Sequence, residues 1–582
     1  MMSRSTARAA SAVLALTLGA MTVAGSGEAQ AQQTAIFGAR DLVHPVYGPN
    51  GMVASQEALA TEIGLGVLKN GGNAVDAAVS VAFALAVTLP RAGNIGGGGF
   101  MMVHDAESGE TVAIDYREMS GAAAFRDMYL DDQGDASKQK SRYSGLAVGV
   151  PGTVAGMALA LERYGTISLA DALAPAIDLA ENGIQVTTDL SESLKGLTDR
   201  LQKWPSSTAV FYKEGGVPYE PGETLVQGDL AASLNSIAQN GPSAFYEGPI
   251  AEKIVAAVEA ADGHLTLDDF KNYEVKLREP VTGTYRGYEI VSMPPPSSGG
   301  VHIVQILNTL EGVPMSFLGH NSADSIHMMA EAMKFAYADR SEYLGDPDFV
   351  DVPVKALTSK TYAADSLAAI SRGRAATAAE IGPADLTPYE SDETTHFSVV
   401  DAEGNAVANT YTLNFSYGTG LIADGTGILL NNELDDFSAK PGVPNAYGLI
   451  GGDANAVEPR KRPLSSMSPT LVLADGLPYL VTGSPGGSRI ITTTLQMIMN
   501  VIDHGMNVAE ATYAPRIHHQ WLPDELRVEE GLSPDTVRLL EQRGQKVVVK
   551  NAMGSTQSIM VTDGGLYGAS DPRRAGALTA GY

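Results

Sequence analysis

The sequence predicts an α+β protein in which helices dominate the first part of the chain and strands the last part. Apolar residues recur at helical spacing in several stretches before Leu344, whereas the stretch after Thr394 alternates with the period of two that is typical of strands. The composition is that of a folded protein, with 44% hydrophobic and 18% charged residues and 63 glycines among 582 residues. A chain of this length exceeds one ordinary single-core domain and can bury a large core.

The charge and the lack of cysteine exclude several kinds of partner and chemistry. The formal net charge is −28, and such a surface repels nucleic acid and anionic membranes, so we expect neither as a partner. The chain has no cysteine, which removes disulfide bonds and thiol catalysis. The acidity by itself indicates solubility and no particular reaction.

The first 31 residues have the features of a signal peptide. Arg4 and Arg8 precede the apolar run AASAVLALTLGAMTVAG, and the sequence AQA at 29–31 fits a cleavage site between small residues. The apolar run is short for a membrane span. We therefore expect a mature chain that begins near Gln32 and is exported to the periplasm or secreted.

Five stretches before Leu344 have the apolar spacing and the end signals of helices. Asn73 can cap the second stretch, an alanine-rich run that we expect to be a buried helix and not a membrane span. Asn70-Gly71 and Asn182-Gly183 end the first and the fourth. The expected helices are residues 55–69, 73–89, 152–163, 168–181 and 321–343, and GYEIVSM at 287–293 is an expected strand. A polar, alanine-rich connector of about residues 346–393 follows and has the composition of a linker between domains.

A β-hairpin is expected directly after the connector. DAEGN at 401–405 forms a turn, and AVANTYTLN at 406–414 returns as the second strand. If the turn is centred on Glu403, Thr394 lies opposite Thr412, and Asn414 lies just beyond it on the same face; a slip of one residue would reverse the faces. The pattern by itself leaves open whether these polar residues form a site or an exposed sheet face.

A second hairpin, LVLADGLPYLVTG at 471–483, leads into the glycine turn GSPGGSRI and then a helix. Gly486 and Gly487 can present bare N–H groups to a developing anion near the start of this helix, although an ordinary strand-to-helix turn has the same sequence. Neither this turn nor GNIGGGGF at 93–100 has the G-x-x-x-x-G-K-[ST] pattern of a phosphate loop. The G-x-S-x-G pattern of a serine nucleophile is also missing from both stretches.

Six motifs in family order resemble the bacterial γ-glutamyltransferases, also called γ-glutamyltranspeptidases or glutathione hydrolases. They are DYREMS at 115–120, TTHFSVVD at 394–401, TYTLNFSYGTG at 410–420, NNELDDFS at 431–438, PLSSMSPT at 463–470 and GSPGGSRI at 483–490. Each motif alone is weak, but the ordered set spans most of the mature chain and is specific. The resemblance implies the four-layer αββα sandwich of the N-terminal-nucleophile hydrolases.

The resemblance also implies that the precursor cuts itself between Glu393 and Thr394. Residues 32–393 would become the large subunit and residues 394–582 the small subunit of a heterodimer. The cut would expose an α-amino group beside the Thr394 hydroxyl, and such an amine titrates near ~7.7–8.0, close to working pH. A threonine with its own amine as general base is an activated nucleophile.

The resemblance also implies a role for each of the other site residues. Thr394 would attack the γ-amide of glutathione or another γ-glutamyl donor and pass the acyl group to water, an amino acid or a peptide. No cofactor and no metal are implied. The implied site consists of Thr412 on the nucleophile, Gly486 and Gly487 at the oxyanion, Arg117, Ser465 and Ser466 at the substrate carboxylate, Asn414, Glu433 and Asp436 at the ammonium, and Tyr447 as the gate of a lid loop at 438–463.

Two departures and several alternatives stay open at this point. Ser120-Gly121 stand where the family often has Ala-Pro, and Glu433 stands where some members carry Gln. Without the family, Arg117 would be a surface ion-pair residue beside Asp115 or Glu118, and the lid would be a flexible surface loop. An acylase of the same fold acting on glutaryl or cephalosporin side chains is one alternative function. A non-catalytic periplasmic binding protein, which would stay one chain on a denaturing gel, is the other.

Overall fold

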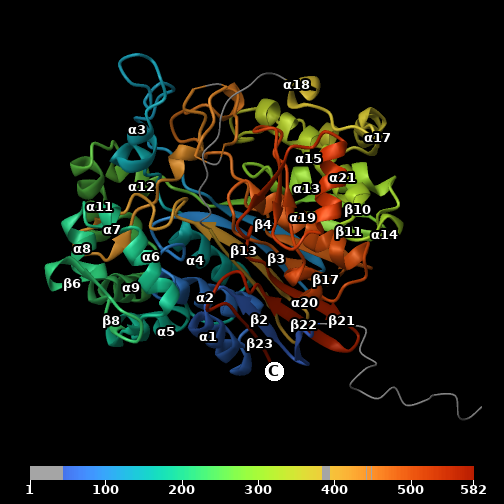
Figure 1. Ribbon diagram of the computed structural model, residues 1–582. Helices are drawn as coiled ribbons and strands as arrows, with labels where there is room; N and C mark the ends of the chain where they lie inside the picture. The colour runs from blue at the N-terminus through green and yellow to red at the C-terminus, as the bar shows by residue number, and fades with distance from the viewer. Residues whose placement is uncertain (1–42, 383–393, 441, 447) are drawn as a thin grey trace, which may run out of the picture. The chain divides into compact units, whose positions relative to one another are not determined.

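The computed structural model describes residues 43–382, 394–440, 442–446 and 448–582 (Figure 1). Contacts divide the chain into residues 1–44 and residues 45–582, and every element described below lies in the second unit. The expected signal peptide, Glu393 and Tyr447 lie outside the described residues. Within the described ranges, no helix is long and apolar enough to cross a membrane.

Two antiparallel sheets of seven strands each form the centre of the second unit. Sheet 1 has the order β23 (Leu578–Gly581), β2 (Met52–Ser55), β12 (Thr395–Val400), β13 (Ala406–Thr412), β3 (Gly98–Asp105), β4 (Glu110–Tyr116) and β9 (Lys276–Arg278). Sheet 2 has the order β1 (Val46–Gly48), β22 (Gly565–Ser570), β21 (Gln557–Thr562), β17 (Leu477–Thr482), β16 (Thr470–Ala474), β11 (Tyr288–Ser292) and β10 (Val281–Tyr285). Both sheets combine strands from before and after Thr394, so residues 346–393 do not separate two domains.

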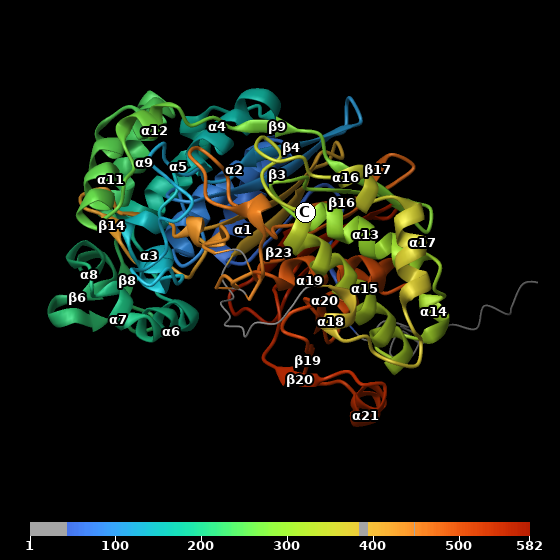
Figure 2. The same cartoon turned by 90° about the horizontal axis from the view of Figure 1, so that it is seen from above.

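Helices cover the outer face of each sheet. The helices α1 (Ala58–Lys69), α2 (Ala74–Thr88) and α4 (Thr153–Tyr164) pack on sheet 1, and α5 (Leu169–Asn182) packs on α2. The helices α13 (Gly299–Glu311), α19 (Arg489–Ile502) and α20 (Val508–Tyr513) pack on sheet 2, and α15 (Ala323–Tyr343) packs on α13. Figures 1 and 2 show the blue α1 and α2 and the α13–α19 group on opposite sides of the strands. The expected four-layer αββα sandwich is confirmed.

Local sequence signals account for these helices. The side chain of Asn73 accepts from the N–H groups of Val75 and Asp76, and Asp76 completes a capping box at the start of α2. Every residue of α2 is buried, which explains its alanine-rich, apolar composition. Gly183 ends α5 with a φ of 86°, a conformation that glycine adopts without strain. Helix α1 begins three residues later than expected because Ser55 belongs to β2.

The expected hairpin register is confirmed. Thr395 pairs with Tyr411 and His396 with Thr410, as a turn centred on Glu403 requires. Odd-numbered residues of β12, such as Phe397, pack in the core beneath the helices of sheet 1. Even-numbered residues of the hairpin point toward sheet 2 instead. The row that begins with Thr394 therefore lies between the two sheets.

The other elements surround this sandwich. The expected connector contains α16 (Val354–Leu357), α17 (Lys360–Ala369) and α18 (Ala378–Ile381). The remaining helices include α3 (Lys138–Tyr143), α6 (Thr188–Gly196), α7 (Thr198–Leu201), α8 (Pro205–Phe211), α9 (Gly228–Asn240), α10 (Ser243–Tyr246), α11 (Pro249–Ala260), α12 (Leu267–Lys271), α14 (Met315–Leu318) and α21 (Pro534–Gln542). Short strands include β5 (Ile184–Gln185), β6 (Tyr212–Lys213), β7 (Val217–Pro218), β8 (Thr224–Leu225), β14 (Ile422–Ala423), β15 (Ile428–Leu429), β18 (Ile517–His518), β19 (Leu526–Glu529) and β20 (Val547–Lys550).

Candidate active site

Thr394 lies at the start of the central strand β12, directly before its first hydrogen-bonded residue. Its Oγ1 lies 3.5 Å from Oγ1 of Thr412, which also accepts the N–H of Asn414 at 2.9 Å. Thr394 is buried, with 6% of its surface exposed. The hairpin register thus brings together the three polar residues that the sequence pattern placed on one face.

The glycine run at 96–99 allows a close approach to the strand that carries Thr412. A Cβ atom on Gly97 would lie 2.1 Å from the carbonyl oxygen of Thr412, and one on Gly99 would lie 2.4 Å from that of Thr410. Any side chain there would push β3 away from β13, to which it is hydrogen-bonded. The GNIGGGGF motif therefore has a packing role beneath the site.

The glycine turn after β17 lies beside Thr394. Gly486 and Gly487 have φ angles of 134° and 55°, and α19 begins two residues later at Arg489. The N–H groups of these two glycines have no hydrogen-bond acceptor among the described residues. Gly487 lines the same pocket as Thr394. The turn can therefore donate hydrogen bonds to an anion that develops next to the threonine hydroxyl.

His396, the histidine nearest to Thr394 in sequence, is not suited to act as its general base. Its ring nitrogens are held by Oγ1 of Thr410 at 2.8 Å and Oγ of Ser398 at 3.1 Å. Burial lowers the pKa of His396 to about 3, so the ring stays neutral at any working pH. Gly483 packs against this ring, where a Cβ would come within 2.4 Å. The histidine fills the space between the sheets.

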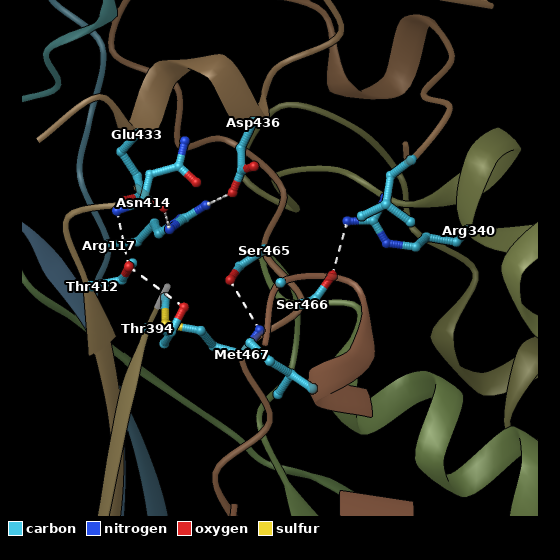
Figure 3. Close-up of a pocket in the computed structure, with 13 residues that line it drawn as sticks. Arg117, Arg340, Thr394, Thr412, Asn414, Glu433, Asp436, Ser465, Ser466 and Met467 are labelled. Atoms are coloured by element: carbon cyan, nitrogen blue, oxygen red, sulfur yellow. Dashed lines mark hydrogen bonds and ion pairs between the residues drawn. The ribbon is translucent and has the colours of Figure 1, made fainter. Parts of the chain in front are cut away.

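Nearly all the predicted site residues line one pocket at Thr394 (Figure 3). Of these, Gly486 is adjacent to the lining but not part of it, and Tyr447 lies outside the described residues. The lining residues are Arg117, Arg340, Thr394, Thr412, Asn414, Glu433, Asp436, Leu449, Ser465, Ser466, Met467, Gly487 and Ile490.

Arg117 is fully buried in this pocket, which corrects the alternative of a surface ion pair. It follows strand β4, and its Nε donates to the carbonyl of Pro463 at 3.2 Å. Its Nη1 pairs with Oε1 of Glu433, and its Nη2 pairs with Oδ2 of Asp436 at 2.6 Å. The two carboxylates expected at a substrate ammonium thus contact Arg117 directly.

A single short 3₁₀ turn, η3 (Glu433–Asp436), supplies both of those carboxylates. The side chain of Asn431 fixes the turn, because its Oδ1 accepts the N–H of Glu433 at 3.1 Å and that of Gly149 at 2.9 Å. Asn414 also contacts this region, since its Nδ2 donates to the carbonyl of Asn432 at 2.9 Å.

Three carboxyl groups surround the single guanidinium of Arg117: those of the buried Glu118 and Glu433 and that of the partly buried Asp436. Burial raises the pKa of Glu118 to about 7 and raises the pKa of Glu433 well above its usual range, in both cases against the opposing effect of Arg117. Burial likewise raises the pKa of Asp436. Burial disfavours the charge of Arg117, but the neighbouring carboxylates outweigh this effect and raise its pKa. A cationic ligand would relieve the repulsion among these acids.

The opposite wall of the pocket contains Ser465 and Ser466, as expected, and also Arg340, which the sequence reasoning missed. Oγ of Ser465 accepts the N–H of Met467 at 3.1 Å, and Oγ of Ser466 accepts from Nη2 of Arg340 at 3.4 Å. Arg340 lies in the last turn of α15, where a cation is ordinarily explained by the helix dipole. No local pattern distinguishes it from such a residue.

Described residues of the loop at 438–463 pack on the acidic side of the pocket. Nδ2 of Asn445 donates to Oδ1 of Asp436 at 3.4 Å, and the N–H of Ala446 donates to Oδ2 of Asp435 at 3.3 Å. Leu449 from the same loop lines the pocket. These contacts place the loop where a cover would be needed.

Comparisons with known proteins agree with this geometry. The family model described as gamma-glutamyltranspeptidase matches residues 60–581. The chain is 60% identical over 544 residues to the glutathione hydrolase proenzyme of Escherichia coli (strain K12), which covers 93% of each chain. The crystal structure of cephalosporin acylase from Bacillus halodurans superposes with a TM-score of 0.82 at 28% identity, covering 94% of this chain and 98% of that one. Helicobacter pylori gamma-glutamyltranspeptidase is 48% identical with a TM-score of 0.55 over 56% of this chain and 93% of that one.

Proposed function

The chain belongs to the γ-glutamyltranspeptidase family, and we propose that Thr394, freed by self-cleavage, is the nucleophile of its γ-glutamyl chemistry. The protein is an enzyme with the fold of the N-terminal-nucleophile hydrolases, and it cleaves and transfers the γ-glutamyl group of glutathione. The observation that carries the residue assignment is the position of the Thr394 hydroxyl, which lies between Thr412 and the glycine turn in a pocket lined by charged groups. Because the chain belongs to this family of enzymes, the alternative of a non-catalytic binding protein is wrong.

Self-cleavage between Glu393 and Thr394 is part of this proposal. The related Escherichia coli protein is named a proenzyme. The two products, residues 32–393 and 394–582, would stay together because β12 is hydrogen-bonded to β2 and β13 to β3 within one sheet. The subunits would thus share a core that neither could form alone.

The proposed reaction uses only groups at this site. The α-amine of Thr394 takes the proton of its own hydroxyl, and Oγ1 attacks the γ-carbonyl carbon of the donor. The resulting oxyanion accepts hydrogen bonds from the N–H groups of Gly486 and Gly487. The amine then returns the proton to the leaving nitrogen, and the acyl group remains as an ester on Oγ1. Water, an amino acid or a peptide amine then attacks this ester and restores the hydroxyl.

The charged groups fit the head of a γ-glutamyl donor. Its ammonium would join Glu433 and Asp436, with Asn414 as a further acceptor, and its carboxylate would meet Arg117, Ser465 and Ser466. The buried acids favour this function over acylase action on glutaryl or cephalosporin side chains, because a glutaryl group has no ammonium. The acylase is the second candidate, since a solved relative at 28% identity is named a cephalosporin acylase.

We further propose that the enzyme acts in the periplasm or after secretion, as the features of residues 1–31 suggest. That Tyr447 is the gate of the lid stays a prediction.

An activity assay on the purified protein tests the central proposal. The protein is incubated with glutathione and with a γ-glutamyl anilide, with and without a dipeptide acceptor. Release of glutamate and formation of a γ-glutamyl dipeptide, both absent in Thr394→Ala, are expected. Turnover that survives in Thr394→Ala would contradict the nucleophile assignment.

A further inference from the structure

Arg340 is a buried cation with no carboxylate within ion-pair distance among the described residues, although the charge of Asp436 acts on it from farther away. Only 4% of its surface is exposed. Its Nε donates to Oγ of Ser298 at 3.0 Å and its Nη2 to Oγ of Ser466 at 3.4 Å, and both acceptors are neutral. Nη1 has no acceptor among the described residues. Burial of a charge without a directly paired opposite charge is costly. Burial lowers the pKa of Arg340 to about 10, even though Asp436 favours its charged form.

Arg117 differs from Arg340 in this respect. Both terminal nitrogens of Arg117 already contact acids, Glu433 and Asp436, and a third acid, Glu118, lies 3.7 Å from Nη1. A substrate carboxylate that approached Arg117 alone would meet a guanidinium surrounded by negative charge. Arg117 can orient that carboxylate, but the surrounding acids offset most of its positive charge.

The pocket is therefore polarised between its two arginines. Figure 3 shows Arg117 between Glu433 and Asp436 on one side, and Arg340 beside Ser466 on the other. A γ-glutamyl head has the same polarity, because one α-carbon bears an ammonium and a carboxylate. With its ammonium at the acidic side, its carboxylate points away from that side and toward the serines.

We propose that Arg340 binds the α-carboxylate of the γ-glutamyl donor, together with Ser466, and supplies the positive charge of that subsite. The inference rests on the proposed function, since it deepens the recognition of the same substrate. Nη1 and Nη2 of the guanidinium would face the two carboxylate oxygens, a geometry that suits arginine and not lysine. The cost of burying Arg340 in the empty enzyme would then be offset when the substrate binds.

The test compares three anilides that differ only in the charges on the acyl group. The γ-glutamyl anilide has both charges, the glutaryl anilide only the carboxylate, and the 4-aminobutanoyl anilide only the ammonium. Arg340→Met removes the guanidinium but keeps an unbranched side chain. We expect kcat/KM to fall roughly 30-fold or more for the two carboxylate substrates, as for loss of one partner of a buried charge pair. The 4-aminobutanoyl anilide should change less than about threefold, and it can be assayed as a competitive inhibitor if its turnover is slow.

A double-mutant cycle separates direct binding from an effect through Ser466. If Arg340 acts only by holding Ser466, then Arg340→Met combined with Ser466→Ala will lose no more than Ser466→Ala alone. Direct binding predicts a further carboxylate-specific loss in the double variant. Arg340→Lys, which keeps the charge without the fork, should lie between wild type and Arg340→Met, and self-cleavage on a gel reports whether each variant folds.

Two outcomes would overturn the inference in different ways. Equal losses on substrates with and without the carboxylate would show that Arg340 supports only the fold, while the proposed function would stand. A wild-type enzyme that does not turn over the γ-glutamyl anilide would overturn the proposed function and this inference with it. If Arg340→Met is not processed, the three anilides are compared on Arg340→Lys instead. Direct binding then predicts a loss in kcat/KM for the two carboxylate substrates, because a guanidinium binds a carboxylate better than an ammonium does.

Discussion

Thr394 and Thr412 face each other across the β12–β13 hairpin, with their hydroxyl oxygens 3.5 Å apart. The register that pairs Thr395 with Tyr411 sets this relationship, so it depends on the turn at 401–405 and not on distant parts of the fold. The hydroxyl of Thr394 is thereby held at the end of a central strand, where the two sheets meet the glycine turn.

Thr394→Ala should remain a single inactive chain, because it lacks the hydroxyl that an N-to-O acyl shift needs. A denaturing gel of the purified protein checks this, and wild type should show two pieces corresponding to residues 32–393 and 394–582. Thr395→Val is a matched control, since its side chain has a similar volume and its hydroxyl has no hydrogen-bond partner among the described residues. Efficient cleavage of Thr394→Ala would remove Thr394 as the nucleophile.

Thr412→Val should slow turnover while largely preserving the fold, because it replaces a hydroxyl with a methyl of similar volume. The Oγ1 of Thr412 accepts from both Thr394 and the backbone of Asn414, and a buried hydrogen bond typically contributes about 0.5–1.5 kcal/mol. We expect kcat to fall roughly tenfold, measured with a γ-glutamyl anilide. Thr412→Ser keeps the hydroxyl and should retain most of the rate; equal rates for the valine and serine variants would argue against the role.

Arg117→Lys should raise KM for γ-glutamyl donors well above wild type while processing continues. A lysine ammonium cannot contact Glu433 and Asp436 in parallel, as the planar guanidinium does. The variant should also melt at a lower temperature, because breaking a buried ion pair leaves an uncompensated charge. Steady-state kinetics and thermal unfolding measure the two effects. An unchanged KM with a lowered Tm would mean that Arg117 is only structural.

Asp436→Asn tests the contribution of the substrate ammonium. The change is nearly isosteric but removes a negative charge, which should cost about 2–5 kcal/mol, or roughly 30- to several-thousand-fold in kcat/KM, for a γ-glutamyl anilide. A glutaryl anilide should change little, because it has no ammonium and Arg117 becomes less neutralised. Self-cleavage should survive. A parallel loss on both anilides would instead assign Asp436 to the scaffold through its pair with Arg117.

Glu118→Gln should alter how stability depends on pH. Burial raises the pKa of Glu118 from 4.5 to about 7 in the folded protein. Between these pH values the folded state holds a proton that the unfolded chain has released, and this stabilises the folded state. The stabilisation is fully present below pH 4.5 and is lost as pH rises through 7. Glutamine does not titrate, so the variant has no such pH dependence at this position.

Thermal unfolding at pH 5, 6, 7 and 8 measures this effect. The Tm of Glu118→Gln relative to wild type should increase with pH. The corresponding change in the free energy of unfolding is at most roughly 3 kcal/mol, since one pKa unit corresponds to about 1.36 kcal/mol. Glu62→Gln, on the exposed side of α1, controls for the general loss of a carboxylate. A constant difference between Glu118→Gln and wild type would show that Glu118 titrates at its ordinary pKa.

Local sequence determined the helix starts and the hairpin register of this protein, because these depend on residues close together in the chain. Asn73 as a cap predicted the start of α2, and the turn around Glu403 predicted which residue faces Thr394. In both cases the groups that interact are close in sequence, so periodicity and turn chemistry suffice. The motif resemblance extended this to the fold and to most of the pocket.

Only the tertiary structure decided how the charges are arranged. Arg117 and Glu433 are 316 positions apart, and no local pattern shows that they form a buried ion pair in place of separate substrate contacts. Arg340 resembles an ordinary basic residue at a helix end until α15 is packed beside Ser466. Periodicity predicts the side of an element on which a residue lies, whereas burial and charge pairing depend on which elements the chain brings together.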